Sequence, residues 1–364
     1  MATGGGPPVA KRHGVRRSLA RGAAPTIVAV AVSLREPFEI GGVRIPNRVV
    51  LAPLAGIGNW FVRLQAKRFG AGLAVSEMVS SFGVHHRNAK TVTEMLRIAP
   101  EERDGGPVSI QLFGQDPAVM RSAAADVARA GADLIDLNMG CPVPKVCRTG
   151  AGAALIDDPD TAVAVARAAR AGSGLPVTVK LRSGRRPGDT HGLRLAHRLV
   201  DEAGVAAIAF HPRSAAVHHK GAPDYELASR LVATLDAPVI LTGGLRDARA
   251  VAAAHAQTGA AAVMLARGAL GNPWLFAEVL GERSAPPARG EVLTELDWVM
   301  DRAVEHLGPD RAGRYLHKFY PWYVDRLRLA PRVAKALQQR LQETSSVGAA
   351  RGLLEGAGAL TAAA

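Results

Sequence analysis

The sequence predicts a closed barrel of eight parallel strands, the (β/α)8 or TIM barrel, followed by a small C-terminal helical domain. Short apolar or β-branched runs alternate eight times with segments of helical period. This alternation covers residues 38–283, close to the ~250 residues that are usual for the fold. The alternative is an open, doubly wound sheet. That fold would carry a glycine fingerprint after its first strand, and residues 52–58 do not form one.

In chain order, the predicted strands occupy residues 48–52, 73–77, 108–113, 133–138, 177–182, 206–211, 238–242 and 261–266. A helical segment follows each of them. Residues 284–290 are rich in proline and glycine, which is typical of a linker. Residues 291–356 return to helical period and form the predicted helical domain.

The composition limits the class of protein. Of the 364 residues, 48% are hydrophobic, which is enough for one large and one small domain. The two cysteines, Cys141 and Cys147, make no disulfide framework, so the cytoplasm is the expected compartment. We also predict a monomer without metal ligands.

The net charge of +13 suggests a polyanionic partner, and six of the positive charges lie in the first 35 residues. Residues 1–33 are predicted to be a disordered basic extension. The alternative is a signal peptide, because the apolar run 23–34 follows basic residues, but this run is short and begins late in the chain. No run reaches the roughly 20 apolar residues that a membrane span needs, so no membrane association is expected.

Chemistry in such a barrel takes place at the carboxyl ends of the strands, which makes the residues there site candidates. In strand order they are Pro53 to Gly56, Glu77 with Met78, Gln111, Asn138 with Cys141, Lys180 with Arg182, His211 with Arg213, Thr242 to Gly244, and Ala266 to Gly268. The turns after strands seven and eight predict a phosphate pocket. Backbone N–H groups and the Arg267 guanidinium would bind a dianion there.

A phosphate pocket, a lysine on strand five and an amide on strand three together predict a flavin mononucleotide site. Reduction of the flavin ring builds negative charge near its N1 atom, and Lys180 would stabilise this charge. Gln111 can donate to and accept from the pyrimidine edge of the ring. The competing interpretation is a sugar-phosphate enzyme that uses Lys180 for a Schiff base. It leaves Gln111, Asn138 and Cys141 without a role.

Cys141 stands between Gly140 and Pro142 at the end of the fourth strand. The glycine lets the backbone approach a bound ring, and the proline fixes the loop, so the sulfur is held in place. This arrangement favours a reactive thiol. The alternative is a cysteine that acts only as a small buried hydrophobic residue.

Seven segments carry a family resemblance: Ala52 to Gly56, Phe69 to Ser80, Ile110 to Phe113, Asp136 to Pro142 with Lys145 and Val146, Gly150 to Leu155, Val179 to Arg182, and Gly271 to Trp274. They resemble the tRNA-dihydrouridine synthases, and among the bacterial branches they are most similar to the B type. The resemblance runs from about Phe38 to Asp325. The Asn-Met-Gly-Cys-Pro sequence at 138–142 is its most specific part.

The resemblance implies an FMN-dependent reduction of the uracil C5–C6 double bond in tRNA, with NADPH as reductant. It implies that flavin N5 delivers hydride to C6 and that Cys141, as general acid, protonates C5 from the opposite side. An ordinary thiol is largely protonated at neutral pH, which agrees with that role. Asn138 would lie near flavin and uracil, and Arg213 near the nucleotide. The implied FMN contacts are Pro53, Leu54, Ala55, Gln111, Lys180, His211, Thr242, Gly243, Gly244, Ala266 and Arg267.

The chain departs from the family pattern at several positions. Thr242 stands where the family usually has asparagine, so the phosphate arm of the flavin is expected to be held differently. Ala215 stands where a second arginine is usual, which changes the expected substrate contacts. Gly150 to Leu155 lacks the preceding strand and the third glycine of a dinucleotide fingerprint. We therefore expect NADPH to visit the flavin face before the RNA does.

In the helical domain, Arg311, Arg314 and Lys318 fall on one helical face, at offsets of three and seven. We predict that they bind RNA phosphates and dock folded RNA on the barrel mouth. Five aromatic residues lie beside them: Tyr315, Phe319, Tyr320, Trp322 and Tyr323. In the alternative, the aromatic residues form a core and the basic residues are a solvated face.

The sequence leaves two alternative functions open. A non-catalytic RNA-binding or flavin-storing relative would be expected to lack Cys141 or Lys180, yet both are present. A flavin barrel that reduces free pyrimidine metabolites would need no helical RNA-docking domain.

Overall fold

The structure is a computed structural model that describes residues 1–5 and 32–359. From residue 32 onward, the described chain belongs to one compact unit. Most of the basic extension predicted for residues 1–33, namely residues 6–31, lies outside the described residues. Among the helices that are described, none is long and apolar enough to cross a membrane.

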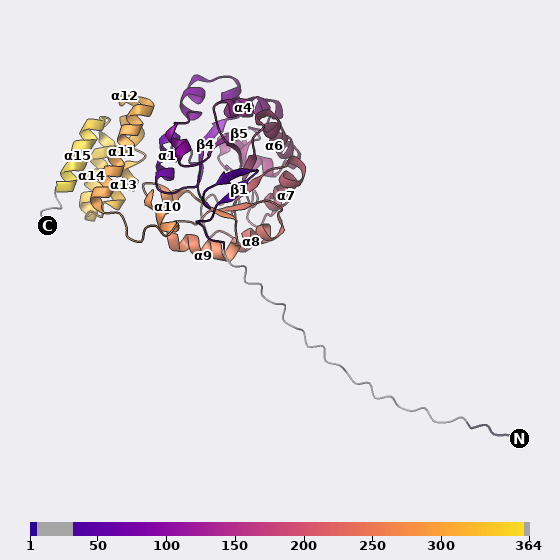
Figure 1. Ribbon diagram of the computed structural model, residues 1–364. Helices are drawn as coiled ribbons and strands as arrows, with labels where there is room; N and C mark the ends of the chain where they lie inside the picture. Colours follow the sequence, from indigo (N-terminus) through magenta and orange to yellow (C-terminus); the bar gives the residue numbers. More distant parts are fainter. Residues whose placement is uncertain (6–31, 360–364) are drawn as a thin grey trace. The chain divides into compact units, whose positions relative to one another are not determined.

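Within residues 32–359, eight parallel strands close into a barrel, which confirms the predicted fold class (Figure 1). The strands are Val49–Leu51 (β3), Leu73–Ser80 (β4), Val108–Phe113 (β5), Leu134–Met139 (β6), Val177–Arg182 (β7), Ala207–His211 (β8), Val239–Thr242 (β9) and Ala262–Leu265 (β10). Each of them overlaps one predicted strand. They pair in chain order from β3 to β10, and β10 pairs with β3 to close the barrel.

Strand β4 extends three residues beyond its predicted end at Glu77. Its register on β5 shifts between Val75 and Met78, which marks a bulge. A bulge changes which side of the strand the following side chains face. Met78 consequently lines the cavity of the barrel, whereas Glu77 lines a neighbouring cavity.

One element lies outside the prediction, a hairpin of Phe38–Ile40 (β1) and Val43–Ile45 (β2). Gly41 and Gly42 form its turn with φ of +57° and +86°, a conformation that glycine adopts without strain. Its buried side chains pack against barrel residues such as Val50 and Leu73. The hairpin therefore covers the end of the barrel opposite the carboxyl ends of the strands.

Helices surround the barrel, and side-chain caps fix where several of them begin. Asn59, Asp116, Asp158, Asp224 and Asp247 each accept a hydrogen bond from the backbone N–H three residues later. The helical elements up to the linker are Trp60–Arg68 (α1), Ser81–His85 (α2), Thr91–Met95 (η1), Glu101–Asp104 (α3), Pro117–Arg129 (α4), Pro144–Cys147 (α5), Gly152–Ile156 (η2), Pro159–Ser173 (α6), His191–Ala203 (α7), Tyr225–Thr234 (α8), Ala248–Thr258 (α9), Arg267–Ala269 (η3) and Trp274–Val279 (α10).

A helical region follows, as the fold prediction requires. In the described chain it consists of Arg289–Leu307 (α11), Pro309–Leu316 (α12), Tyr320–Arg326 (α13), Pro331–Glu343 (α14) and Val347–Ala359 (α15). Phe319, Tyr320 and Tyr323 are at most 3% exposed, so these aromatic residues form a core. Gln65 of α1 donates to the Glu295 carboxylate at 2.8 Å and to the Tyr323 hydroxyl at 2.9 Å. These bonds join the barrel to the helical region.

A buried ion pair joins α1 to α3, and its loss is expected to destabilise the fold. Arg63 Nε donates to Glu102 Oε2 at 2.7 Å, and both side chains are 0% exposed. Glu102→Ala would leave a buried charge unpaired, so we expect the free energy of unfolding to fall by about 3–5 kcal/mol in urea unfolding. The exposed neighbour Glu101 supplies the control, and Glu101→Ala should change stability by about 0.5 kcal/mol or less. Equal losses in the two variants would contradict this account.

Candidate active site

A cavity of about 400 Å³ opens at the carboxyl ends of the barrel strands. Residues on or directly after all eight strands line it. Among them are Cys141, Asn138 and every residue predicted to contact the cofactor: Pro53, Leu54, Ala55, Gln111, Lys180, His211, Thr242, Gly243, Gly244, Ala266 and Arg267. The fold thus brings these residues together, while the role of each stays a prediction.

Asn138 fixes the loop that carries Cys141. Its Oδ1 accepts hydrogen bonds from the N–H groups of Gly140 at 3.2 Å and Cys141 at 2.9 Å. From the other side, the Ala153 N–H donates to the Cys141 carbonyl at 3.0 Å. A Cβ on Gly152, where φ is +63°, would lie 2.8 Å from that same oxygen. The glycine-rich segment therefore packs against the cysteine loop, which explains Gly152 without a dinucleotide site.

The Cys141 thiol is chemically distinct from the Cys147 thiol. Partial burial raises the pKa of Cys141 above its ordinary value, although a hydrogen bond from the Val143 backbone opposes this rise. The thiol is therefore protonated at neutral pH and can donate a proton. Cys147 instead donates its own hydrogen bond to the Cys141 carbonyl at 3.3 Å. Of the two cysteines, Cys141 lines the cavity.

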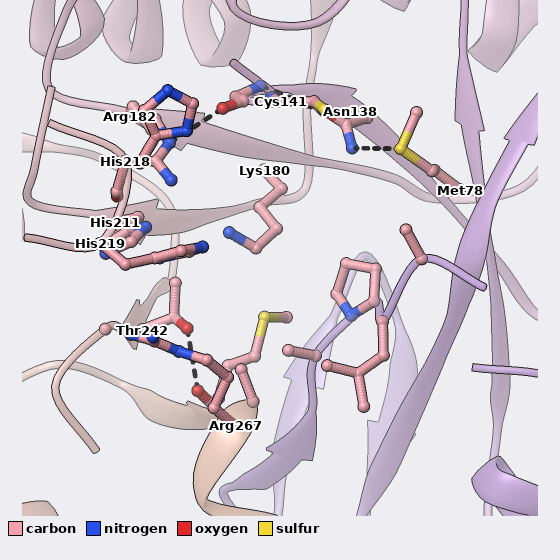
Figure 2. Close-up of a pocket in the computed structure, with 18 of the residues that line it drawn as sticks. Met78, Asn138, Cys141, Lys180, Arg182, His211, His218, His219, Thr242 and Arg267 are labelled. Atoms are coloured by element: carbon pink, nitrogen blue, oxygen red, sulfur yellow. Dashed lines mark hydrogen bonds between the residues drawn. The ribbon is translucent and has the colours of Figure 1, made fainter. Parts of the chain in front are cut away.

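The Lys180 side chain extends from β7 into the middle of the cavity (Figure 2). None of the residues that the structure describes accepts a hydrogen bond from its ammonium group. Burial, and secondly the nearby Arg182, lower the pKa of Lys180 to about 8. A half-buried ammonium group without a hydrogen-bond partner is unfavourable, so the cavity is suited to a ligand that carries or develops negative charge.

Asp136 is a further polar residue of this region, and the sequence interpretation assigned it no role. Gln111 Nε2 donates to Asp136 Oδ2 at 2.6 Å, and Gln111 Oε1 accepts from Asn138 at 2.9 Å. Burial raises the pKa of Asp136 to about 6, while hydrogen bonds from Thr178 and Gln111 oppose the rise. Residues two apart on a strand share a face, so the spacing of Asp136 and Asn138 was the available signal.

The turns after β9 and β10 form one end of the cavity. Gly243 and Gly244 have φ of +103° and +82°, and a Cβ on Gly243 would lie 2.4 Å from His211. A Cβ on Gly268 would lie 2.7 Å from the Leu245 carbonyl. Glycine is therefore required in both turns, and the backbone stays close to the cavity. The predicted Arg267 lines the cavity at the second of these turns. Arg246, His218 and His219 are lining residues outside the prediction, and His218 lies beside Arg182 (Figure 2).

Arg213 and Thr242 are predicted ligand contacts whose side chains form hydrogen bonds within the protein. Arg213 is 8% exposed and donates to the Gly221 carbonyl at 2.6 Å, and one of its amino groups lies 3.1 Å from His211 Nε2. Its Nε has no partner among the described residues. The Thr242 hydroxyl donates to the Met264 carbonyl at 2.9 Å and so ties β9 to β10. Both side chains hold the strand ends in place.

The predicted RNA contacts Arg311, Arg314 and Lys318 line a second cavity, of about 380 Å³, which barrel and helical residues share. Arg311 donates to both carboxylate oxygens of Glu94, at 2.8 and 3.0 Å. Lys318 donates to the Gly56 carbonyl at 3.0 Å, in the loop after β3. The other titratable residues in its lining are Glu77, Lys90, His306 and Tyr315. The cavity therefore carries more cationic than acidic side chains.

The fold and the site define a TIM-barrel enzyme whose polar groups gather at the carboxyl ends of the strands. A family profile described as dihydrouridine synthase matches residues 50–358, which is most of the chain. The chain belongs to the dihydrouridine synthase family and is a flavin-dependent oxidoreductase of that family. The resemblance seen in the sequence motifs is thereby confirmed.

Individual relatives agree with this assignment. The tRNA-dihydrouridine synthase B of Xanthomonas axonopodis pv. citri is 34% identical over 291 residues, which are 79% of this chain and 86% of that protein. A probable tRNA-dihydrouridine synthase of Mycobacterium tuberculosis is 36% identical over 314 residues, covering 81% and 79% of the two chains.

Solved structures share the fold at low identity. A 2-naphthoyl-CoA reductase complex aligns with a TM-score of 0.55 and 14% identity, covering 69% of this chain and 52% of that one. An old yellow enzyme homologue from Zymomonas mobilis aligns with a TM-score of 0.52 and 14% identity, covering 69% and 93%.

Proposed function

We propose that the protein is an FMN-dependent tRNA-dihydrouridine synthase that uses NADPH to reduce the C5–C6 double bond of specific uridines in tRNA. The observation that carries the proposal is the presence of the Cys141 thiol and the Lys180 ammonium in one cavity that ends in glycine turns. Reduction of an electron-poor double bond needs a proton donor and a cation near the developing negative charge. Membership of the family and the names of the relatives support tRNA as the substrate.

The cavity fits a flavin mononucleotide on two observations. The Lys180 ammonium, which lines the cavity, has no hydrogen-bond acceptor among the described residues, and the turns at Gly243 and Gly268 leave no room for a side chain. When bound, FMN supplies the hydride that uracil C6 receives. The residues proposed to hold it are Pro53, Leu54, Ala55, Gln111, Lys180, His211, Thr242, Gly243, Gly244, Ala266 and Arg267.

Cys141 supplies the proton that completes the reduction. Its S–H bond breaks as a C–H bond forms at uracil C5, and a thiolate remains on the enzyme. Burial keeps the thiol protonated beforehand, and the cations Arg182 and Lys180 favour the thiolate afterwards. The two hydrogen bonds that Asn138 Oδ1 accepts from the Gly140 and Cys141 N–H groups hold the loop while the proton moves. Arg182 adds a third, because it donates to the Gly140 carbonyl at 2.9 Å.

NADPH and RNA are proposed to use the same cavity in turn. The glycine segment that could have suggested a separate dinucleotide site contacts the Cys141 carbonyl instead. We further propose that the enzyme works in the cytoplasm as a monomer. Its two cysteines are free, which suits a reducing compartment.

The cofactor can be identified directly. Purified protein is expected to be yellow, and denaturation should release FMN, because the glycine turns suit a single phosphate and no residue pattern for covalent attachment is evident. Chromatography of the released flavin distinguishes FMN from a dinucleotide flavin. A colourless protein that takes up no added FMN would contradict the proposal that FMN is the cofactor.

The second cavity is proposed to dock the RNA. A uracil that lies on the flavin has left its base stack, at a cost of a few kcal/mol that contacts elsewhere on the RNA must offset. Reversing Arg311, Arg314 and Lys318 to glutamate should weaken tRNA binding steeply and flatten its salt dependence by up to about three phosphate contacts. Flavin reduction by NADPH should stay unchanged. Filter binding of tRNA at several salt concentrations measures both effects.

A matched control comes from α14. Arg332, Lys335 and Arg340 are exposed there, and their reversal to glutamate changes the net charge by the same amount. This variant should keep most of its affinity for tRNA. If the variant with Arg311, Arg314 and Lys318 reversed keeps its affinity for tRNA and its salt dependence, the RNA docks on another part of the barrel rim.

A further inference from the structure

We propose that Asp136 is a positioning residue, which fixes the loop that presents Cys141 by orienting the side-chain amides of Gln111 and Asn138. The proposal rests on the proposed function in one respect, that Cys141 is the proton donor. The hydrogen bonds that carry it are observed independently of any substrate.

A directional chain of hydrogen bonds runs from the barrel interior to the cysteine loop. Gln111 Nε2 donates to Asp136 Oδ2 at 2.6 Å, and Asn138 Nδ2 donates to Gln111 Oε1 at 2.9 Å. Asn138 Oδ1 then accepts from the backbone N–H groups of Gly140 at 3.2 Å and Cys141 at 2.9 Å. Each of the two side-chain amides therefore accepts on one side and donates on the other.

The two amides in this chain cannot set its direction by themselves. The oxygen and nitrogen ends of a side-chain amide have nearly the same shape, so Gln111 and Asn138 could each turn over. If both turned, the Asn138 NH₂ group would face the N–H groups of the loop, and donor would meet donor. An ionised carboxylate only accepts hydrogen bonds, so Asp136 requires the NH₂ group of Gln111 on its side. Gln111 in turn presents its oxygen to the Asn138 NH₂ group, so Asp136 supports from one end of the chain the orientation that the loop N–H groups require at the other.

The burial of the inner part of this chain makes its direction consequential. Asp136 is 1% exposed and Gln111 is 0% exposed, so water cannot replace a mispaired group at these two residues. The second carboxylate oxygen accepts from Thr178 Oγ1 at 2.6 Å. Desolvation opposes ionisation at this position, as the raised pKa of Asp136 indicates. Stability alone therefore does not favour a carboxylate here, whereas orienting the amides requires a group that accepts without donating.

Amide hydrogen exchange tests the proposal in the flavin-loaded protein without RNA. In Asp136→Ala, exchange at Gly140 and Cys141 should accelerate about tenfold relative to the amides of β9, as expected when one ordinary hydrogen bond is lost. Thr178→Val is the matched control, because it removes the other side-chain hydrogen bond of the same carboxylate and leaves the chain intact. In Thr178→Val, the exchange rates at Gly140 and Cys141, relative to those of the β9 amides, should equal the wild-type values.

Two results would overturn the proposal. Exchange at Gly140 and Cys141 could keep its wild-type rate in Asp136→Ala, or the amides of the loop and of β9 could accelerate in parallel, as for a residue that only stabilises the fold. If the alanine variant does not fold, Asp136→Asn serves instead. Asparagine both donates and accepts, so the direction is no longer imposed, and a smaller acceleration confined to the same two amides is expected. Wild-type protection in Asp136→Asn would then refute the proposal. Because no RNA is present, these outcomes are separate from any failure of uridine reduction.

Discussion

Replacing Cys141 by alanine is expected to lower the rate of uridine reduction in tRNA by about 10²–10⁴, the usual contribution of a positioned proton donor. The reason is that the variant loses the acidic hydrogen that the loop holds in the cavity, while the loop itself keeps its backbone hydrogen bonds. Reduction of the bound flavin by NADPH should be nearly unchanged, because that step needs no proton from Cys141. Stopped-flow absorbance measures separately the reduction of the flavin by NADPH and its reoxidation by the uridine in tRNA.

The second cysteine provides the control. Cys147 donates its hydrogen bond to the Cys141 carbonyl, so Cys147→Ala removes a thiol close to the site without removing the proposed acid. It should lower uridine reduction much less than Cys141→Ala does. Equal turnover of tRNA by Cys141→Ala and the wild type would mean that the proton comes from another group.

Replacing Lys180 by methionine is expected to weaken flavin binding and to slow flavin reduction by about 10²–10³, the range for loss of one positioned electrostatic group. Methionine keeps much of the side-chain volume but cannot stabilise negative charge on the ring. The pKa of Lys180, lowered to about 8, adds a pH signature. Below this value the ammonium is charged, so the reduction rate of the wild type should fall as the pH rises above about 8. Lys180→Met should lack this fall.

Lys67 offers a matched control for that experiment. Burial also lowers the pKa of Lys67 to about 8, but its ammonium donates to the Gly106 carbonyl at 2.6 Å, away from the residues that line the flavin cavity. Lys67→Met should lower thermal stability and leave flavin content and reduction rate at wild-type levels. Loss of flavin in both variants to the same extent would show that the effect at Lys180 is one of stability.

The barrel and most of its site could be predicted because local patterns determine them. Eight apolar runs with helical segments between them suffice for the closed sheet, and parallel strands place their carboxyl ends at one edge. Residues near the carboxyl ends of the strands, such as Gln111 and Lys180, therefore had to share a cavity. The glycine turns at Gly243 and Gly268 could be predicted for the same reason, since they follow the last two strands in the chain.

The remaining features depend on contacts between distant segments. His218 and His219 reach the cavity from a long loop rather than from a strand end, so no periodicity places them there. Arg311 pairs with Glu94, 217 positions away in the chain. The sequence alone does not show that this carboxylate would form an ion pair with the arginine predicted to bind phosphate. Glycine is required at position 152 because of a contact as well, since a Cβ there would collide with the Cys141 carbonyl.

The most direct test of the account is nucleoside mass spectrometry of tRNA that lacks dihydrouridine. The tRNA would be incubated with the flavin-loaded protein and NADPH, digested, and compared with a parallel sample treated with Cys141→Ala. We expect the wild type to convert a defined uridine into a nucleoside heavier by two hydrogens, and the variant to convert very little in the same time. Unaltered tRNA after treatment with fully flavin-loaded, NADPH-reduced wild-type protein would contradict the assignment.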